Sequence, residues 1–209
     1  MTHQTGIREL DRKLGGGIPS GTLVAVEAPP RAQREPLLCA GAGQRATRYF
    51  STIKSEQAVR KQFERAQTDA KLHAIDEIRP ESATGTIPAH LEDLETEQDF
   101  VVDVVDPIED TVDPRTYGDF MNDLTEHLAD TDSVGYLYAY ASGEQTRQRQ
   151  ITLDIADFVW QFEPVESRGE INYTLKIPKT NGLDLSATDR YLEIQVGEEV
   201  DIDQTRNIG

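Results

Sequence analysis

Residues 14–35 read LGGGIPSGTLVAVEAPPRAQRE, and this stretch indicates the fold class. Its glycines mark turns, because glycine adopts backbone conformations that other residues avoid. The run Thr22–Val26 is apolar and β-branched, as is typical of a buried strand. Pro29-Pro30 ends that strand, and we expect a helix from about Glu35 to Gly41. A strand, a loop and a helix in this order are typical of α/β proteins.

The rest of the chain continues the alternation of strands and helices and then becomes rich in strands. A helical stripe of apolar residues over 117–128 is the clearest helix signal. We expect further strands over 48–52, 72–75, 100–105, 133–141, 158–162, 171–177 and 191–196, and helices over 55–66, 89–95 and 151–156. This pattern predicts one α/β domain over residues 1–209, with a mainly parallel sheet and an antiparallel C-terminal extension.

The charge balance is strongly acidic. The chain has 21 Lys+Arg against 38 Asp+Glu, a net charge of −17, and most of its cations are arginines. Such a surface repels polyanions, which argues against a general binder of DNA or anionic membranes. An acidic, lysine-poor composition resembles that of haloarchaeal proteins, which stay soluble in high salt. Without a signal pattern or a long apolar run, we expect a cytoplasmic protein that does not enter a membrane.

Several segments, taken in order, resemble the opening of RecA-like ATPases of the KaiC/RadA type. These are Gly6-Ile7, Leu10-Asp11, Leu14-Gly15-Gly16-Gly17-Ile18-Pro19 and Gly21-Thr22-Leu23. Later agreements are Ser51-Thr52 after a strand, an apolar strand carrying Asp103, a strand at 134–141, and Ile177-Pro178-Lys179 followed by Gly182. The resemblance implies a RecA-like P-loop NTPase fold that binds ATP and magnesium and assembles into rings or filaments.

The chain departs from this family at the phosphate-binding loop. The family has G-P-P-G-x-G-K-[ST], whereas residues 28–35 here read APPRAQRE. Glycines let such a loop aim successive N–H groups at phosphate oxygens, and a non-glycine residue in a left-handed conformation costs roughly 1–2 kcal/mol. Arg34 takes the place of the phosphate lysine and Glu35 that of the magnesium hydroxyl. We therefore expect a degenerate loop, whose candidate nucleotide contacts are Arg31, Gln33, Arg34 and Glu35.

Two further parts of the resembled ATPase site can be placed on the sequence. The water-activating glutamate belongs near Ser51-Thr52, where Ile53 and Lys54 stand and cannot accept a proton from water at neutral pH. The acid that holds magnesium belongs at the end of an apolar strand, where Asp103 fits and Asp106 is the alternative. A strand-end aspartate that caps the next turn is the simpler interpretation of Asp103.

Basic residues give two more candidates. Lys179 lies where the resembled family carries a basic finger that reaches a neighbouring subunit's nucleotide, although Asn181 replaces its second basic residue. Arg147 and Arg149 make the expected loop at 142–150 locally basic, and the corresponding region of recombinases contacts DNA. Solvent-exposed lysine and arginine side chains without a ligand explain both features more simply.

These observations favour a non-catalytic regulatory or interaction protein with a RecA/KaiC-like fold and a decayed ATPase site. Catalysis is not expected, because the glycines, the lysine and the glutamate are missing together. The expected partner is a protein or a second copy of the chain. Two alternatives stay open: an ATP·Mg-binding ATPase with an unconventional loop, and an accessory nucleic-acid-binding protein in recombination or transcription.

Overall fold

The computed structural model describes most of the chain, and the account below concerns the residues that it describes. They are 1–32, 37, 44–65, 71–93, 98–141, 145–167, 170–186, 189–196 and 200–201. Of the helix expected over 35–41 only Leu37 is in this set, and the loop residues Gln33, Arg34 and Glu35 lie outside it.

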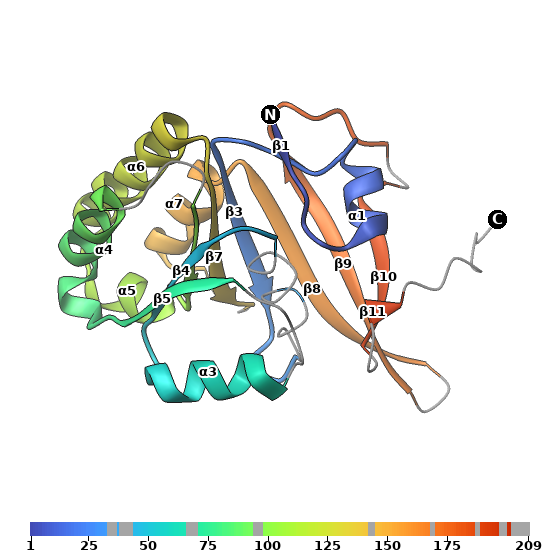
Figure 1. Ribbon diagram of the computed structural model, residues 1–209, viewed down its shortest axis with the longest axis horizontal. Coiled ribbons are helices and arrows are strands. Elements are labelled where there is room, and N and C mark those ends of the chain that lie inside the picture. Colours follow the sequence, from blue (N-terminus) through green and yellow to red (C-terminus); the bar gives the residue numbers. More distant parts are fainter. Residues whose placement is uncertain are drawn as a thin grey trace.

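A nine-stranded sheet forms the centre of the molecule, in the order β11-β10-β9-β8-β3-β7-β6-β4-β5 (Figure 1). Its strands are β3 (Thr22–Ala28), β4 (Thr47–Ser51), β5 (Leu72–Glu77), β6 (Asp99–Asp103), β7 (Val134–Tyr140), β8 (Phe158–Ser167), β9 (Glu170–Thr180), β10 (Tyr191–Val196) and β11 (Val200–Asp201). From β8 to β5 all neighbours are parallel, and β8 to β11 are antiparallel. The predicted fold class is confirmed, including the pairing of the last long strands.

Strand β3 is the central strand of the nine, and both of its faces are enclosed. All seven of its residues are buried, and it pairs with β7 on one side and β8 on the other. Leu23 belongs to the core cluster on one face, and Val24 and Val26 belong to the cluster on the other face. A strand enclosed on both faces loses the polar alternation of a surface strand, which is why its sequence is a continuous apolar run.

Helices cover both faces of the sheet. The helices are α1 (Arg8–Lys13), α3 (Glu56–Arg65), the 3-10 turn η1 (Pro80–Ser82), α4 (Ala83–Glu92), α5 (Asp106–Thr111), α6 (Pro114–Thr131) and α7 (Arg147–Ile155). Buried residues of α1 and α3 join the cluster of Val24, whereas those of α4, α5 and α6 join the cluster of Leu23. Helices α4, α5 and α6 lie together on one side of the sheet (Figure 1).

The structure differs from the sequence prediction at several helices. Helices α1 and α5 were not expected, and each has only six residues. Helix α4 begins at Ala83, before the predicted 89–95, and continues through Pro88. Helix α7 begins at Arg147, inside the predicted loop, because the Thr146 hydroxyl accepts the Arg149 backbone N–H at 3.1 Å and caps it.

The glycine-rich opening closes a small hairpin. Strand β1 (Thr2–His3) pairs with β2 (Ile18–Pro19), and Gly17 has a φ of 125°. A Cβ atom at Gly17 would lie 2.2 Å from the His3 carbonyl oxygen, so only glycine fits there. Gly17 therefore allows the backbone before β2 to lie close to the backbone of β1.

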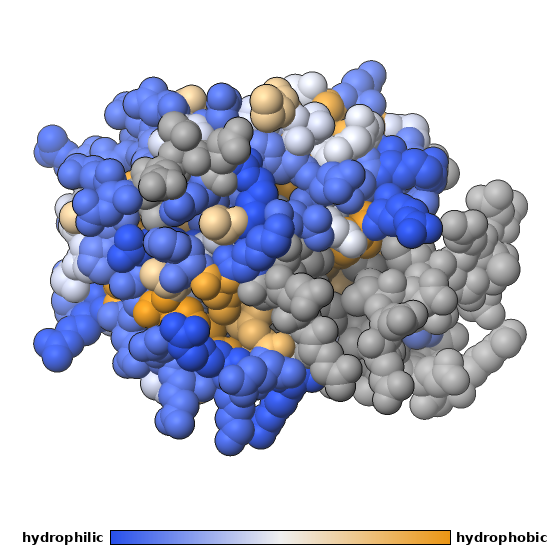
Figure 2. Space-filling view, viewed as in Figure 1, coloured by the Kyte–Doolittle hydropathy of each residue, from blue (hydrophilic) through white to orange (hydrophobic). Residues whose placement is uncertain are grey.

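The surface of the described chain is mainly polar. Hydrophilic side chains cover most of the described part of the face in Figure 2. No helix among the described residues is both long and apolar enough to cross a bilayer.

Candidate functional site

The carboxyl ends of β3, β7, β6 and β4 meet at one edge of the sheet. Ala28 lies opposite Tyr140 in the register of β3 and β7, and Asp103 lies opposite Ser51 in that of β6 and β4. In open α/β sheets this edge is where ligands bind. It contains Arg31, Asp103 and Asp106 of the sequence-predicted site, together with Lys54, which stands where the resemblance places the water-activating glutamate.

The turn after β3 contains the described part of the degenerate loop. The Pro29 carbonyl accepts the Ala32 N–H at 2.9 Å, Arg31 is exposed, and Ala32 packs into the core. Asp132 is the only non-glycine residue with a positive φ in the described chain, so Arg31 and Ala32 do not adopt the left-handed conformation. A turn closed in this way directs the Ala32 N–H to its own chain.

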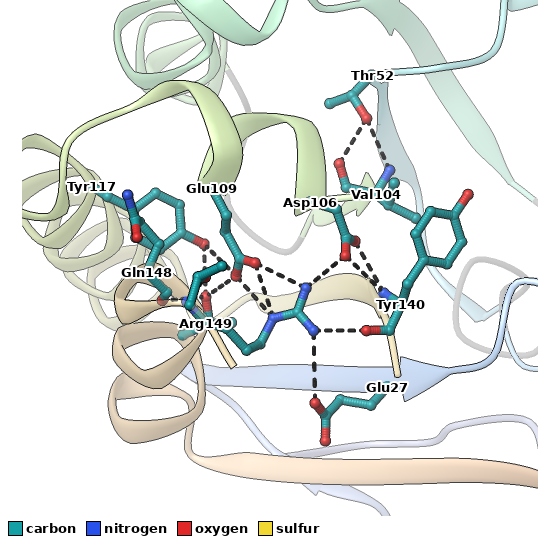
Figure 3. A network of polar contacts seen from close by, with 11 residues as sticks. Glu27, Thr52, Val104, Asp106, Glu109, Tyr117, Tyr140, Gln148 and Arg149 are labelled. Carbon is teal, nitrogen blue, oxygen red and sulfur yellow. Dashed lines mark hydrogen bonds and ion pairs between the residues drawn. The ribbon is translucent and has the colours of Figure 1, made fainter. Parts of the chain in front are cut away.

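The turn after β4 is held firmly against β6. The Thr52 N–H donates to the Asp103 carbonyl at 3.0 Å. The Thr52 hydroxyl donates to the Val104 carbonyl at 2.7 Å and accepts the Val104 N–H at 3.1 Å (Figure 3). Ile53 follows, and its exposed fraction is 51%. The turn thus presents an apolar side chain to solvent at the place where the resembled ATPases have a water-activating glutamate.

Asp103 is fully buried at the end of β6 and has a cation beside it. The Tyr49 hydroxyl donates to Asp103 Oδ2 at 2.5 Å, and Lys54 Nζ lies 3.6 Å from the same oxygen. Lys54 Nζ also donates to Gln62 Oε1 of α3 at 2.7 Å. At this separation the attraction is ~5 kcal/mol at an effective dielectric near 20, before the cost of burying the charges.

Asp106, the alternative magnesium acid, opens helix α5. Its carboxylate accepts the Tyr140 N–H at 3.0 Å and pairs with the Arg149 guanidinium at 2.8 Å (Figure 3). Asp103 is therefore the strand-end acid, and Asp106 ties α5 to the end of β7.

Arg149 is the centre of a buried network that joins four elements. Its guanidinium lies 2.8 Å from Glu109 and from Asp106, and 3.7 Å from Glu27 of β3. It also donates to the Tyr140 carbonyl of β7 at 2.8 Å (Figure 3). Burial alone lowers the pKa of Arg149, but the hydrogen bonds and charges of Glu109 and Asp106 outweigh it and raise the pKa.

The same network continues through neutral hydroxyl groups. Thr152 donates to Glu109 at 2.6 Å, and the Tyr117 hydroxyl lies 2.7 Å from that of Thr152. Burial and the charge of Glu109 raise the pKa of Tyr117. The phenol therefore stays neutral and serves as a hydrogen-bonding group.

This network corrects the prediction made for the basic segment. Arg149 is 3% exposed and points into the protein, so its side chain is not presented to nucleic acid. Arg147 is exposed on α7 and donates to Gln150 at 3.2 Å. Glu27 and Glu109 were not predicted from the sequence. The available signal was Glu27, a glutamate next to the apolar residues of β3, because a buried charge requires a partner.

Lys179 of β9 lies against the C-terminus of α7. Its ammonium group donates to the carbonyls of Leu153 at 3.0 Å and Asp154 at 2.5 Å. Carbonyls at a helix C-terminus have no partner within the helix and carry partial negative charge, so a lysine here stabilises the helix. In this structure the predicted finger contacts its own chain.

Comparison with known proteins gives a family and a fold. A protein family of unknown function, DUF7125, matches residues 2–209. This chain belongs to the DUF7125 family. The crystal structure of a KaiC-like protein from the hyperthermophilic archaeon Pyrococcus horikoshii OT3 is similar, with a TM-score of 0.77 and 15% identity over 96% of this chain and 97% of that one. The likeness shows a RecA-like fold, and no curated protein matches the sequence.

Among the described residues of this DUF7125 chain, two features differ from a magnesium-nucleotide site as the resembled ATPases would hold it. The described loop lacks glycine and left-handed residues, and Lys54 lies against the acid that would approach the metal. Within the described residues, no three His, Cys, Asp or Glu side chains are grouped so that they could hold a metal ion.

Proposed function

We propose that this DUF7125 chain is a non-catalytic RecA-like protein with a regulatory or interaction role. In this proposal the carboxyl edge of the sheet contacts a protein partner or a second copy of the chain. The observation that carries the proposal is the contact of Lys54 with Asp103, because it places a fixed cation on the acid that an ATPase of this fold would use for magnesium.

The other carboxylates at this edge support the same proposal. Glu27, Asp106 and Glu109 all face the Arg149 guanidinium, so their charges are used within the protein. A general base must reach the water that it activates, and a carboxylate held by a buried guanidinium is poorly placed for that.

Titration calorimetry with ATP·Mg in molar KCl tests the loss of nucleotide binding. We expect no binding heat in the micromolar range and no phosphate release. Arg31→Ala is the matched variant, because Arg31 is the exposed cation of the described loop, and we expect its titration to equal that of the unmodified chain. Micromolar binding that Arg31→Ala weakens would establish the competing proposal, an ATP-binding protein with an unconventional loop.

Site-specific photocrosslinking tests the interaction role. A photoreactive residue at Ile53, 51% exposed at this edge, is compared in the native host with one at Val165, 42% exposed on β8. The proposal predicts a discrete adduct at position 53 and none at position 165. Equal labelling, or no adduct at position 53, would argue against a partner at this edge.

The nucleic-acid alternative now depends on Arg147, because Arg149 is buried and Arg147 is exposed. Binding through this side chain should fall steeply with salt and should weaken in Arg147→Glu. We expect no retention of DNA or RNA by either protein, because the chain has a net charge of −17.

A further inference from the structure

The buried carboxylate of Asp103 requires a positive charge. Its exposed fraction is 0%, and the Tyr49 hydroxyl that donates to it at 2.5 Å brings no charge of its own. A carboxylate enclosed in this way is costly without a cation, because it has lost most of its hydration. ATPases of the resembled family meet this need with magnesium.

Lys54 supplies the charge, and the chain fixes its position from three sides. Its ammonium group lies 3.6 Å from Asp103 Oδ2 and donates to Gln62 Oε1 of α3 at 2.7 Å. Its backbone N–H donates to the Ser51 hydroxyl at 3.0 Å, at the end of β4. The lysine is therefore anchored to β4, α3 and the end of β6 at once.

We propose that Lys54 is a built-in substitute for a divalent cation at this edge. An ammonium group beside Asp103 repels a second cation, so the edge keeps one electrostatic state whether or not metal ions are present. Recognition of a partner here would then be independent of magnesium and nucleotide. This inference rests on the proposed loss of the magnesium-nucleotide site and names the residue responsible for it.

Thermal unfolding of a small set of variants, without nucleotide, tests the inference. Lys54→Met removes the charge at nearly constant length, Lys54→Arg keeps it, and Lys54→Met with Asp103→Asn removes both charges. Lys61→Met is the matched control, because Lys61 is an exposed lysine on α3, the helix that carries Gln62. Each protein is measured with MgCl2 and with KCl at equal ionic strength.

We expect the unmodified chain, Lys54→Arg and Lys61→Met to unfold at the same temperature in both salts. Lys54→Met should unfold at a lower temperature, and magnesium should raise its midpoint by roughly 2–4 °C because the cation can now reach Asp103. Adding Asp103→Asn should recover the lost stability and abolish the response to magnesium.

Three results would overturn the inference. The first is that Lys54→Met lowers the unfolding midpoint no more than Lys61→Met does. The second is that magnesium raises the midpoint of the unmodified chain as much as that of Lys54→Met. The third is that magnesium does not raise the midpoint of Lys54→Met. If Lys54→Met does not fold, the double variant must fold; failure of both shows that the loss does not come from Asp103. Calorimetry with ATP·Mg concerns nucleotide only, so the proposed function and this inference can fail separately.

Discussion

At the scale of single residues, the most heavily used side chain is Arg149. One guanidinium faces the carboxylates of Glu27, Asp106 and Glu109 and also holds the Tyr140 carbonyl. Removing this guanidinium would destabilise the fold, because the carboxylates would stay buried without a cation. Arg147, two residues earlier on the same helix, is exposed and lacks this environment.

Replacing Arg149 should therefore destabilise the fold far more than replacing Arg147. We expect Arg149→Met to lower the free energy of unfolding by about 3–5 kcal/mol. Arg147→Met should change it by less than about 0.5 kcal/mol. Denaturant unfolding of both variants measures the difference. Similar losses in the two would mean that the Arg149 network is not a main source of stability.

At the scale of elements, the contact of β6 with β7 depends on one glycine. Gly135 lies opposite Phe100 in the register of these strands, and a Cβ atom at Gly135 would lie 2.5 Å from the Phe100 ring. The fully buried aromatic ring thus occupies the space that a side chain on β7 would need. The pair fixes how closely the two strands pack.

Gly135→Ala should destabilise the protein by about 1–3 kcal/mol, because the alanine methyl group overpacks the core. Adding Phe100→Leu to Gly135→Ala should recover part of this loss, since a smaller side chain leaves room for the methyl group. Denaturant unfolding of the single and double variants gives the coupling between the two positions. Losses that simply add would contradict a contact between Cβ and the ring.

Helix α6 contains a histidine whose pKa depends on its packing. Burial lowers the pKa of His127 from its usual 6.5, and the charge of Asp130 opposes this only partly. The unfolded chain therefore binds more protons just below pH 6.5 than the folded chain does, so stability is lost as the pH falls through this value. Above the pKa of the unfolded chain the histidine is neutral in both states and costs nothing.

We expect His127→Gln to reduce the loss of stability between about pH 7.5 and about pH 5.5. His73→Gln is the control, because His73 is exposed on β5, and it should leave the pH dependence unchanged. Denaturant unfolding at several pH values provides the comparison. An identical slope in His127→Gln and the unmodified chain would show that another group is responsible.

The elements also show what the sequence could predict. The sequence predicted strands such as β3 and β7 because buried strands are runs of consecutive apolar residues. It predicted helix α6 because its apolar residues recur with the period of a helix. The six-residue helices α1 and α5 were missed because so short a helix depends on packing rather than on its own propensity. Asp103 was found as a strand-end acid, but its contact with Lys54 follows from β4 and β6 being neighbours, which local sequence does not specify.

At the scale of the whole molecule, charge is the dominant property. The net charge is −17, and the described exposed pairs, such as Glu163 with Lys176, are each worth only about 0.2–1 kcal/mol. The buried pairs of Arg149 are enclosed and are screened much less by salt. Repulsion among surface carboxylates should therefore control how the stability of this protein depends on salt.

Stability should accordingly rise with KCl. The screening length falls from about 10 Å at 0.1 M to about 3 Å at 1 M, which removes most of the repulsion between surface carboxylates. Thermal unfolding across this range should show a rising midpoint. The loss caused by Arg149→Met should stay nearly constant across it, because that network is buried. A midpoint that does not change with KCl would contradict the expectation that this protein is adapted to high salt. If the destabilisation caused by Arg149→Met shrinks as KCl rises, Arg149 behaves as a screened surface charge.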